Sequence, residues 1–179
     1  ALVPITVYDT WVQKAAGVSL KNAKITLFQN EVKQESAVGK VLFTHVGLSG
    51  PAILNMSREI GELLKYGELF LELDLLPKEG YEKVNALLQA LLKENHTKKI
   101  KNSLGILVSP ALVPIVLELS KIDPDTFCNS LTREARVRLM KTLKHLRVQV
   151  KGLLGMEKAV ITAGGVDLTE IDFKTMRSL

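Results

Sequence analysis

The alternation of hydrophobic and polar residues marks the first 76 residues as mainly β-structure. It is clearest at 68–76, where leucines at every second position oppose acidic residues: Leu69, Leu71, Leu73 and Leu75. β-branched and aromatic residues predict further strands at 3–8, 24–29, 32–36 and 40–45. The dipeptide Asn30-Glu31 is the expected hairpin turn between the second and third of these. One helix interrupts the series, from about Pro51 to Ile60, and Gly61 is its expected end.

The spacing of hydrophobic residues changes after Pro77, from every second residue to every third or fourth. This spacing predicts amphipathic helices at 81–94 and at 131–146, the second with a polar face that carries Arg133 and Arg136. Between them, Ser109-Pro110 is expected to begin a helix that Pro114 kinks or restarts. A short strand is expected to follow at 158–162.

The order of these elements predicts an α+β fold, a β-barrel-like subdomain with an inserted small helical bundle. The barrel-like subdomain is discontinuous and takes residues 1–77 and 147–179, and the helical bundle subdomain takes residues 78–146. The last strand must then return to the sheet that the chain leaves at Leu76.

The composition is that of a globular protein, and it excludes several classes of site. A single cysteine among 179 residues rules out an internal disulfide and a Cys-based zinc site, and the three histidines lack metal-ligand spacing, so no metal is expected. The longest apolar run, at 104–119, is broken by two prolines and predicts no membrane contact. The lone cysteine and the absence of a leader sequence favour a cytoplasmic location. A start without Met is what a piece of a longer protein would show.

The charge is concentrated in the middle of the chain. Residues 78–151 carry 14 Lys and Arg against 7 Asp and Glu, whereas the remainder carries 10 against 12. The basic helical lobe leaves one alternative function open, that of a nucleic-acid-binding module that contacts phosphates. Few aromatic residues are interleaved with the cations, however, and a charged helix face is usually solvated. Nucleic acid is therefore not the expected partner.

The stretch VLFTHVGLSGPAIL at 41–54 is the first candidate for chemistry. A serine-nucleophile elbow would need glycine where Pro51 stands, which argues against that reading. A helix start remains possible, in which Ser49 caps free N–H groups and Pro51 occupies the first turn, and such an end binds anions. An ordinary capped turn without a ligand remains open beside it.

The stretch Thr162-Ala163-Gly164-Gly165-Val166 is the second candidate, because paired glycines allow positive φ or close approach by another group. A tight turn explains it equally well. The chain contains neither the Gly-x-Gly-x-x-Gly pattern nor a phosphate-binding loop, so it carries no nucleotide fingerprint of its own.

Together the two stretches resemble a bacterial flavoprotein family. Residues 41–52 resemble its F-T-H-x-G-L-S-G-P-A signature, and residues 160–178 resemble its T-A-G-G-V and E-I-D-P-K-T-M-E-S-K segments. This is the YhiN/BaiN-like family of NAD(P)/FAD-dependent oxidoreductases. The chain departs from the second segment at Phe173, Arg177 and Leu179.

The resemblance implies an insert domain within a longer chain, whose FAD-binding domain the insert interrupts. The parent would use FAD, with NAD(P)H as a possible reductant, whereas no cofactor bound to this fragment and no catalysis by it are expected. The insert would cover the flavin and shape the pocket for a small-molecule substrate. Its partner is then the FAD-binding domain of the same parent chain. The expected flavin- or substrate-proximal residues are His45, Gly47, Ser49, Gly50, Pro51, Thr162, Gly164, Gly165 and Val166. No catalytic residue is assigned.

Overall fold

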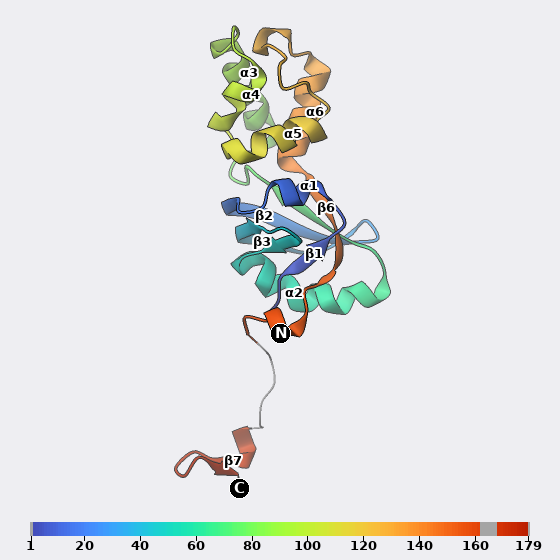
Figure 1. Cartoon of the computed structure of the whole chain (residues 1–179), viewed down its shortest axis with the longest axis vertical. Helices are drawn as coiled ribbons and strands as arrows, with labels where there is room; N and C mark the ends of the chain where they lie inside the picture. Colours follow the sequence, from blue (N-terminus) through green and yellow to red (C-terminus); the bar gives the residue numbers. More distant parts are fainter. Residues whose placement is uncertain (1, 162–167, 179) are drawn as a thin grey trace.

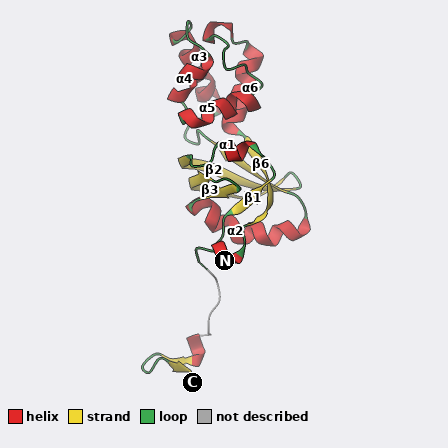
Figure 2. Ribbon diagram, viewed as in Figure 1, coloured by secondary structure: helices red, strands yellow, loops and turns green. Residues whose placement is uncertain are grey.

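A closed β-barrel forms one lobe of the molecule. The computed structural model describes residues 2–161 and 168–178. Its strands are joined in the antiparallel order β1-β4-β3-β2-β5-β6, and β1 pairs with β6 to close the barrel (Figure 1). The strands are β1 (Ile5–Val7), β2 (Ser19–Gln29), β3 (Val32–Phe43), β4 (Gly47–Ser49), β5 (Leu69–Asp74) and β6 (Leu146–Leu153). Together with the helices, they confirm the predicted α+β fold with a β-barrel (Figure 2).

Two strand predictions are tested directly. Asn30 and Glu31 form the expected turn, and both have positive φ, 47° and 67°. Such turns match the right-handed twist of paired strands. In β5, Leu69, Leu71 and Leu73 are completely buried and alternate with half-buried residues, as the pattern predicts. The strands expected separately at 32–36 and 40–45 are one strand, β3, because the register with β2 continues through Gly39.

Helix α2 (Pro51–Leu63) packs against β3, β4 and the neighbouring strands of the barrel. It buries Ile53, Met56 and Ile60, spaced three and four residues apart. The helix does not end at Gly61 as expected. It continues to Leu63 and into a 3₁₀ turn (Leu64–Tyr66). Gly61 serves packing instead, since a Cβ there would lie 2.8 Å from Leu153 Cδ1.

The second lobe is helical and lies between β5 and β6 in the sequence. Figure 1 shows it at one end of the barrel, beside the short helix α1, while α2 lies at the other end. Its helices are α3 (Tyr81–Glu94), α4 (Ile100–Ser103), α5 (Val113–Leu119) and α6 (Arg133–Lys144), and α1 is Trp11–Lys14. Ser109-Pro110 begins only a 3₁₀ turn (Pro110–Leu112), and α5 restarts with Pro114 in its first turn.

The closing strand of the barrel begins where the predicted helix was expected to end, and the sequence pattern predicted no strand at this position. Helix α6 ends at Lys144, and Leu146–Leu153 forms β6, which pairs with both β5 and β1. No strand forms at 158–161. Within those residues Ile161 makes only an isolated bridge to Leu2, and a 3₁₀ turn (Met156–Lys158) precedes it. Beyond residue 167, the structure describes a 3₁₀ turn (Leu168–Glu170) and a small hairpin of β7 (Ile171–Asp172) and β8 (Arg177–Ser178).

One buried lysine joins the two lobes. Lys144 Nζ lies 2.6 Å from Asp74 Oδ2 at the end of β5, and it donates to the carbonyl oxygens of Leu76 (3.0 Å) and Glu79 (2.6 Å). Only 8% of the Lys144 side chain is exposed. A charge so buried needs all of these acceptors to offset its desolvation. The link between β5 and α3 is thereby held against the end of α6. Within the described residues, no helix is long and apolar enough to cross a membrane.

Candidate functional site

The first motif forms the turn between β3 and β4 and the start of α2. Thr44 holds the turn, because its Oγ1 accepts from Gly47 N at 3.1 Å and its backbone N–H donates to Gly47 O at 2.8 Å. His45 is exposed at the tip of this turn. The turn lies beside the segment that follows α1, since Gly17 N donates to Phe43 O at 2.9 Å.

Both glycines of the motif are required by the packing of the barrel. A Cβ on Gly47 would overlap the carbonyl oxygen of Ile5 on β1. Gly50 has a φ of +95°, and a Cβ there would lie 2.8 Å from the carbonyl oxygen of Lys40. Close approach by backbone is thus a sufficient reason for each glycine. Neither glycine marks a cradle that stands open for a ligand.

The prediction that Ser49 caps α2 is wrong. Ser49 is the last residue of β4 and pairs with Leu42, so its backbone belongs to the sheet. Gly50 holds the N-cap position and no side chain caps the helix, while Pro51 is in the first turn as expected. The N–H groups of this turn therefore receive no side-chain acceptor, and the positive end of the helix dipole remains uncompensated there.

The motif is stretched along β4 rather than gathered at one point. His45 precedes β4 and Pro51 follows it, so the two residues lie at opposite ends of the strand. Because β4 runs antiparallel to β1, with Leu48 opposite Ile5, the Pro51 end lies toward the first residues of the chain. The five residue steps from His45 to Gly50 span roughly 16 Å when extended. His45 and Pro51 therefore form no local cluster.

Most of the second motif lies outside the described residues, and with it Thr162, Gly164, Gly165 and Val166. The residues just before it are placed. Ile161 accepts a hydrogen bond from Leu2 N at 2.7 Å, and Val160 N donates to Leu2 O at 2.9 Å. Val3, the residue after Leu2, donates its N–H to Ser57 Oγ on α2 at 3.2 Å. The segment that enters the barrel at Leu2 and the segment that leaves it at Ile161 therefore lie side by side, against α2.

A hollow of about 470 Å³ lies at this end of the barrel. Val3, Gly61 and Leu153 contribute apolar atoms to it, and Arg58, Glu62 and Lys65 of α2 and the turn that follows contribute charges. Lys65 Nζ lies 2.9 Å from Glu62 Oε2. Among the described residues, no group of three or more His, Cys, Asp and Glu side chains is placed to hold a metal ion.

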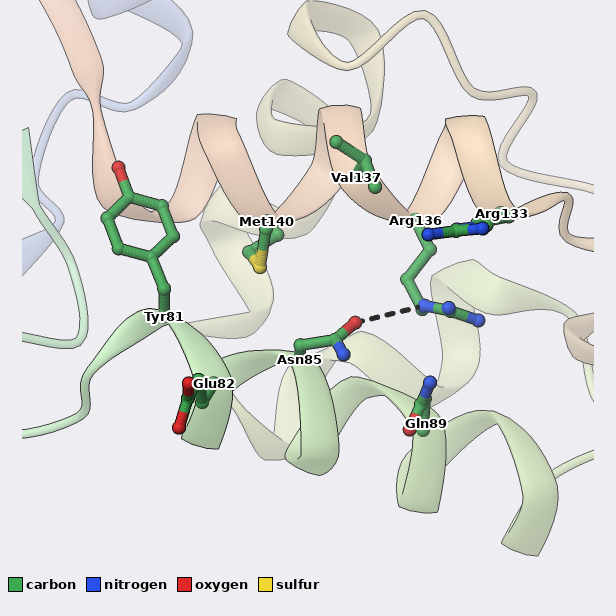
Figure 3. Close-up of a pocket in the computed structure, with 8 residues that line it drawn as sticks. All are labelled: Tyr81, Glu82, Asn85, Gln89, Arg133, Arg136, Val137 and Met140. Carbon is green, nitrogen blue, oxygen red and sulfur yellow. Dashed lines mark hydrogen bonds between the residues drawn. The ribbon is translucent and has the colours of Figure 1, made fainter.

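A larger hollow lies on the helical lobe, between α3 and α6. It measures about 560 Å³, and Figure 3 shows Tyr81 at one end and Arg133 and Arg136 at the other. From the sequence, the two arginines were expected on the polar face of a helix in the basic lobe, for which nucleic-acid binding was the alternative function, and Tyr81 was not singled out. Tyr81 and Arg133 are 52 positions apart in the chain, and the packing of α3 on α6 brings them to one groove.

The chain matches a family model and several curated relatives. A family model described as HI0933-like protein barrel and H2TH domain matches residues 1–161. The chain is 32% identical over 180 residues to the ribosomal RNA dihydrouridine synthase of Escherichia coli, covering 99% of this chain and 42% of the relative. It is 30% identical to the Haemophilus influenzae protein of the same name, of which it covers 41%.

A third relative carries a different name. The chain is 27% identical over 179 residues to the 3-dehydro-bile acid delta(4,6)-reductase of Clostridium scindens, covering 99% of this chain and 44% of the relative. The chain thus spans less than half the length of each of these curated relatives.

Proposed function

We infer the role of this chain from its family: it belongs to the HI0933-like proteins with a barrel and H2TH domain, the YhiN/BaiN-like flavoproteins. We propose that it is the insert domain of an FAD-dependent reductase, that it covers the flavin of its parent chain, and that it shapes the substrate pocket. The observation that carries the proposal is the pairing of Leu2 with Ile161, which brings the two connections of the barrel side by side. A domain with adjacent connections can be inserted into another domain without disturbing its fold.

The relatives' names share one chemistry, and we extend that chemistry to this protein. Making dihydrouridine from uridine saturates a carbon–carbon double bond, and so does a bile acid delta(4,6)-reductase. Such a reduction adds one hydride and one proton, and a reduced flavin supplies the hydride when it is bound. NAD(P)H is the proposed source of the electrons. The residues of this chain would exclude water and orient the substrate.

The described residues do not fit FAD by themselves. Backbone atoms of neighbouring strands occupy the space beside Gly47 and Gly50 that a side chain would take. The sequence also contains no glycine-rich phosphate-binding loop. What this chain can offer is the uncapped start of α2, where the helix dipole favours negative charge. Pro51 is exposed at this start and is the natural contact point for an anionic group of a reduced flavin or of a substrate.

The proposal is tested with Pro51→Glu in the full-length protein that contains this chain. A carboxylate suits the first turn of a helix, so folding is preserved. If α2 begins beside the flavin, the new charge repels its anionic groups. We expect FAD affinity or kcat/KM with NAD(P)H to fall at least about fivefold, since a repulsion of ~1 kcal/mol changes a constant by roughly that factor.

The matched control is Tyr66→Glu, which places the same charge on an exposed residue beyond the other end of α2. It should change neither quantity. Unchanged FAD affinity and turnover in Pro51→Glu would remove the start of α2 from the site. Absence of FAD from the purified full-length protein, or stoichiometric FAD binding by residues 1–179 alone, would contradict the insert proposal as a whole.

A further inference from the structure

A hollow of about 310 Å³ lies at the junction of the barrel and the helical lobe. Strands β2 and β5 form its barrel side, with Lys24 and Thr26 on β2. The link between β5 and α3 and the end of α6 form the other side, with Tyr81 and His145. A molecule bound in this hollow would contact both lobes and the link between them. We call it the junction pocket.

The carboxylates of the junction pocket are compensated within the fold. In each, a basic nitrogen lies 2.6 Å from a carboxylate oxygen, and the pairs are Asp74 with Lys144, Glu79 with Lys83 and Glu72 with His145. Arg147 Nε adds a further positive charge 3.9 Å from the second oxygen of Glu72. Because their charges are already matched, these carboxylates create no need for a cationic ligand.

Lys24 differs from the other charged groups that line the pocket. Its side chain is exposed, and among the described residues no carboxylate lies within ion-pair distance of it. Asp74 stands opposite Lys24 in the register of β2 and β5, but its carboxylate is held by Lys144. The charge that the fold leaves unmatched in the pocket is therefore positive, and an anionic ligand is complementary to it.

Thr26 supplies an unused hydroxyl beside this charge. Only 9% of the residue is exposed, and its hydroxyl makes no hydrogen bond to another described residue. A buried hydroxyl without a partner is unfavourable, so a ligand oxygen that accepts from it would recover the lost hydrogen bond. Thr26 is two positions from Lys24 on β2, so the two side chains lie on the same side of the strand.

One ammonium group and one hydroxyl match a carboxylate better than a phosphate. A carboxylate carries one negative charge and two acceptor oxygens, one for each of these donors. A phosphate ester carries nearly two charges at neutral pH. Its second charge would face Glu72 and Asp74 without a free cation to balance it.

The size and the walls of the pocket indicate an organic ligand rather than an inorganic ion. Its volume is that of about ten water molecules, which leaves room for a small apolar body beside the carboxylate. Pro77 and the ring of Tyr81 offer apolar contacts to such a body. The Tyr81 ring is held in place by stacking on His145, with centroids 5.5 Å apart and planes 30° apart.

We propose that the junction pocket binds a small organic monocarboxylate, whose oxygens accept hydrogen bonds from Lys24 Nζ and Thr26 Oγ1. Its apolar part would rest against Tyr81, so the ligand would bridge the barrel and the lobe. The site goes beyond the proposed function, since it lies at the lobe end of the barrel whereas the start of α2 lies at the other end (Figure 1). Binding would hold the lobe on the barrel.

The test uses benzoate and benzamide, which share a ring and differ in charge, with isothermal titration calorimetry of the full-length protein. For benzoate we expect a Kd of about 1 mM or lower, as for a good ligand of about nine non-hydrogen atoms, and for benzamide at least tenfold weaker binding. Lys24→Gln should weaken benzoate binding at least fivefold, and Lys24→Arg, which keeps the charge, should restore most of it.

Thr26→Val separates binding from folding, because valine keeps the shape and removes the hydroxyl. Without ligand, this variant should melt at the same temperature as the unaltered protein or higher, since the hydroxyl has no partner to lose. With about 20 mM benzoate, its gain in melting temperature should be smaller than that of the unaltered protein. Benzoate should also slow proteolysis between residues 75 and 80 in the unaltered protein and not in Lys24→Gln.

The matched control is Lys21→Gln. Lys21 is an exposed lysine of the same strand that does not line the pocket, and its loss should change the affinity for benzoate less than twofold. Absence of benzoate binding, equal binding of benzamide, or equal benzoate affinity in Lys24→Gln overturns the proposal. Tighter binding of inorganic phosphate than of benzoate also overturns it. None of these measurements depends on FAD content or turnover, so failure of the reductase assignment leaves this test intact.

Discussion

Gly50 adopts φ +95° and ψ 162°, a combination that is open almost only to glycine. Its position follows from the path of the chain, which leaves β4 and must turn at once into α2 beside β3. The carbonyl oxygen of Lys40 and the backbone N of Leu42 close the space into which a side chain would point, at 2.8 and 3.1 Å from an added Cβ. A substitution at Gly50 is therefore expected to destabilise the fold whether or not a ligand binds nearby.

We expect Gly50→Ala to lower the free energy of unfolding by about 1–3 kcal/mol, the usual cost of a strained backbone conformation. Chemical denaturation monitored by circular dichroism measures it. The control is Gly105→Ala, where φ is not positive and the nearest atom to an added Cβ is 3.6 Å away. That variant should be neutral or slightly stabilising. Equal stability of both variants would contradict the strain at Gly50.

The glycines also show what a sequence motif can and cannot reveal at the scale of single residues. The sequence placed a strand end, a turn and a helix start around Gly47 and Gly50, and the structure has all three. A requirement for glycine, however, reads the same in sequence whether a ligand or a neighbouring strand approaches. Only the position of Ile5, 42 residues earlier on β1, tells that the space at Gly47 is occupied by the protein itself.

Among the elements, the junction of α6 and β6 shows how a local pattern can misplace a boundary, since the predicted helix extends two residues beyond Lys144. Leu139, Leu143 and Leu146 continue one helical spacing across the end of α6, so the periodicity alone predicts a helix up to 146. The strand itself alternates correctly, with Leu146, Val148 and Val150 buried. Its pairing with β5 and β1, which are distant in sequence, decides the outcome. By contrast α3, which is bounded by Gly80 and Asn95, spans the predicted residues 81–94.

The junction of α6 and β6 depends on Lys144, and we expect Lys144→Met to lower the free energy of unfolding by about 3–5 kcal/mol. The reason is that Asp74 would remain in a largely buried position without its cation, and the carbonyl oxygens of Leu76 and Glu79 would lose their donor. Urea denaturation measures the loss, and limited proteolysis should show new cleavage between residues 75 and 80.

The matched control is Lys141→Met, one turn earlier on α6. Lys141 is exposed and lies outside the described ion pairs, so its replacement should change the stability by less than about 0.5 kcal/mol. If both variants lose the same amount of stability, the contacts of Lys144 with Asp74 and with the two carbonyl oxygens do not stabilise the junction more than an exposed lysine does.

At the scale of the whole molecule, the helical lobe is an insertion into a β-hairpin. Strands β5 and β6 pair from Leu69 with Val150 up to Leu73 with Leu146, and the entire lobe leaves and rejoins the barrel at this point. The barrel therefore has its own closed hydrogen-bonding pattern, and the groove on α3 and α6 belongs to a separable structure. This arrangement makes it possible to remove the lobe and keep the barrel.

We expect the barrel to fold when residues 75–144 of the full-length protein are replaced by Asn-Gly. Asp74 and His145 would then flank a two-residue turn of the kind that joins antiparallel strands with the required twist. Trp11, the single tryptophan of residues 1–179, reports on the barrel because it is buried and its ring lies 6.0 Å from that of Phe43. A blue-shifted Trp11 emission and a cooperative melting transition, with a lower midpoint, are the expected results.

The shortened protein also tests which lobe lies beside the flavin in the proposed arrangement. FAD should still bind, because the start of α2 and the paired connections at Leu2 and Ile161 lie at the opposite end of the barrel from the lobe. Loss of FAD with a folded barrel would mean that the lobe itself takes part in covering the flavin. That result would contradict a flavin site formed by the barrel end alone.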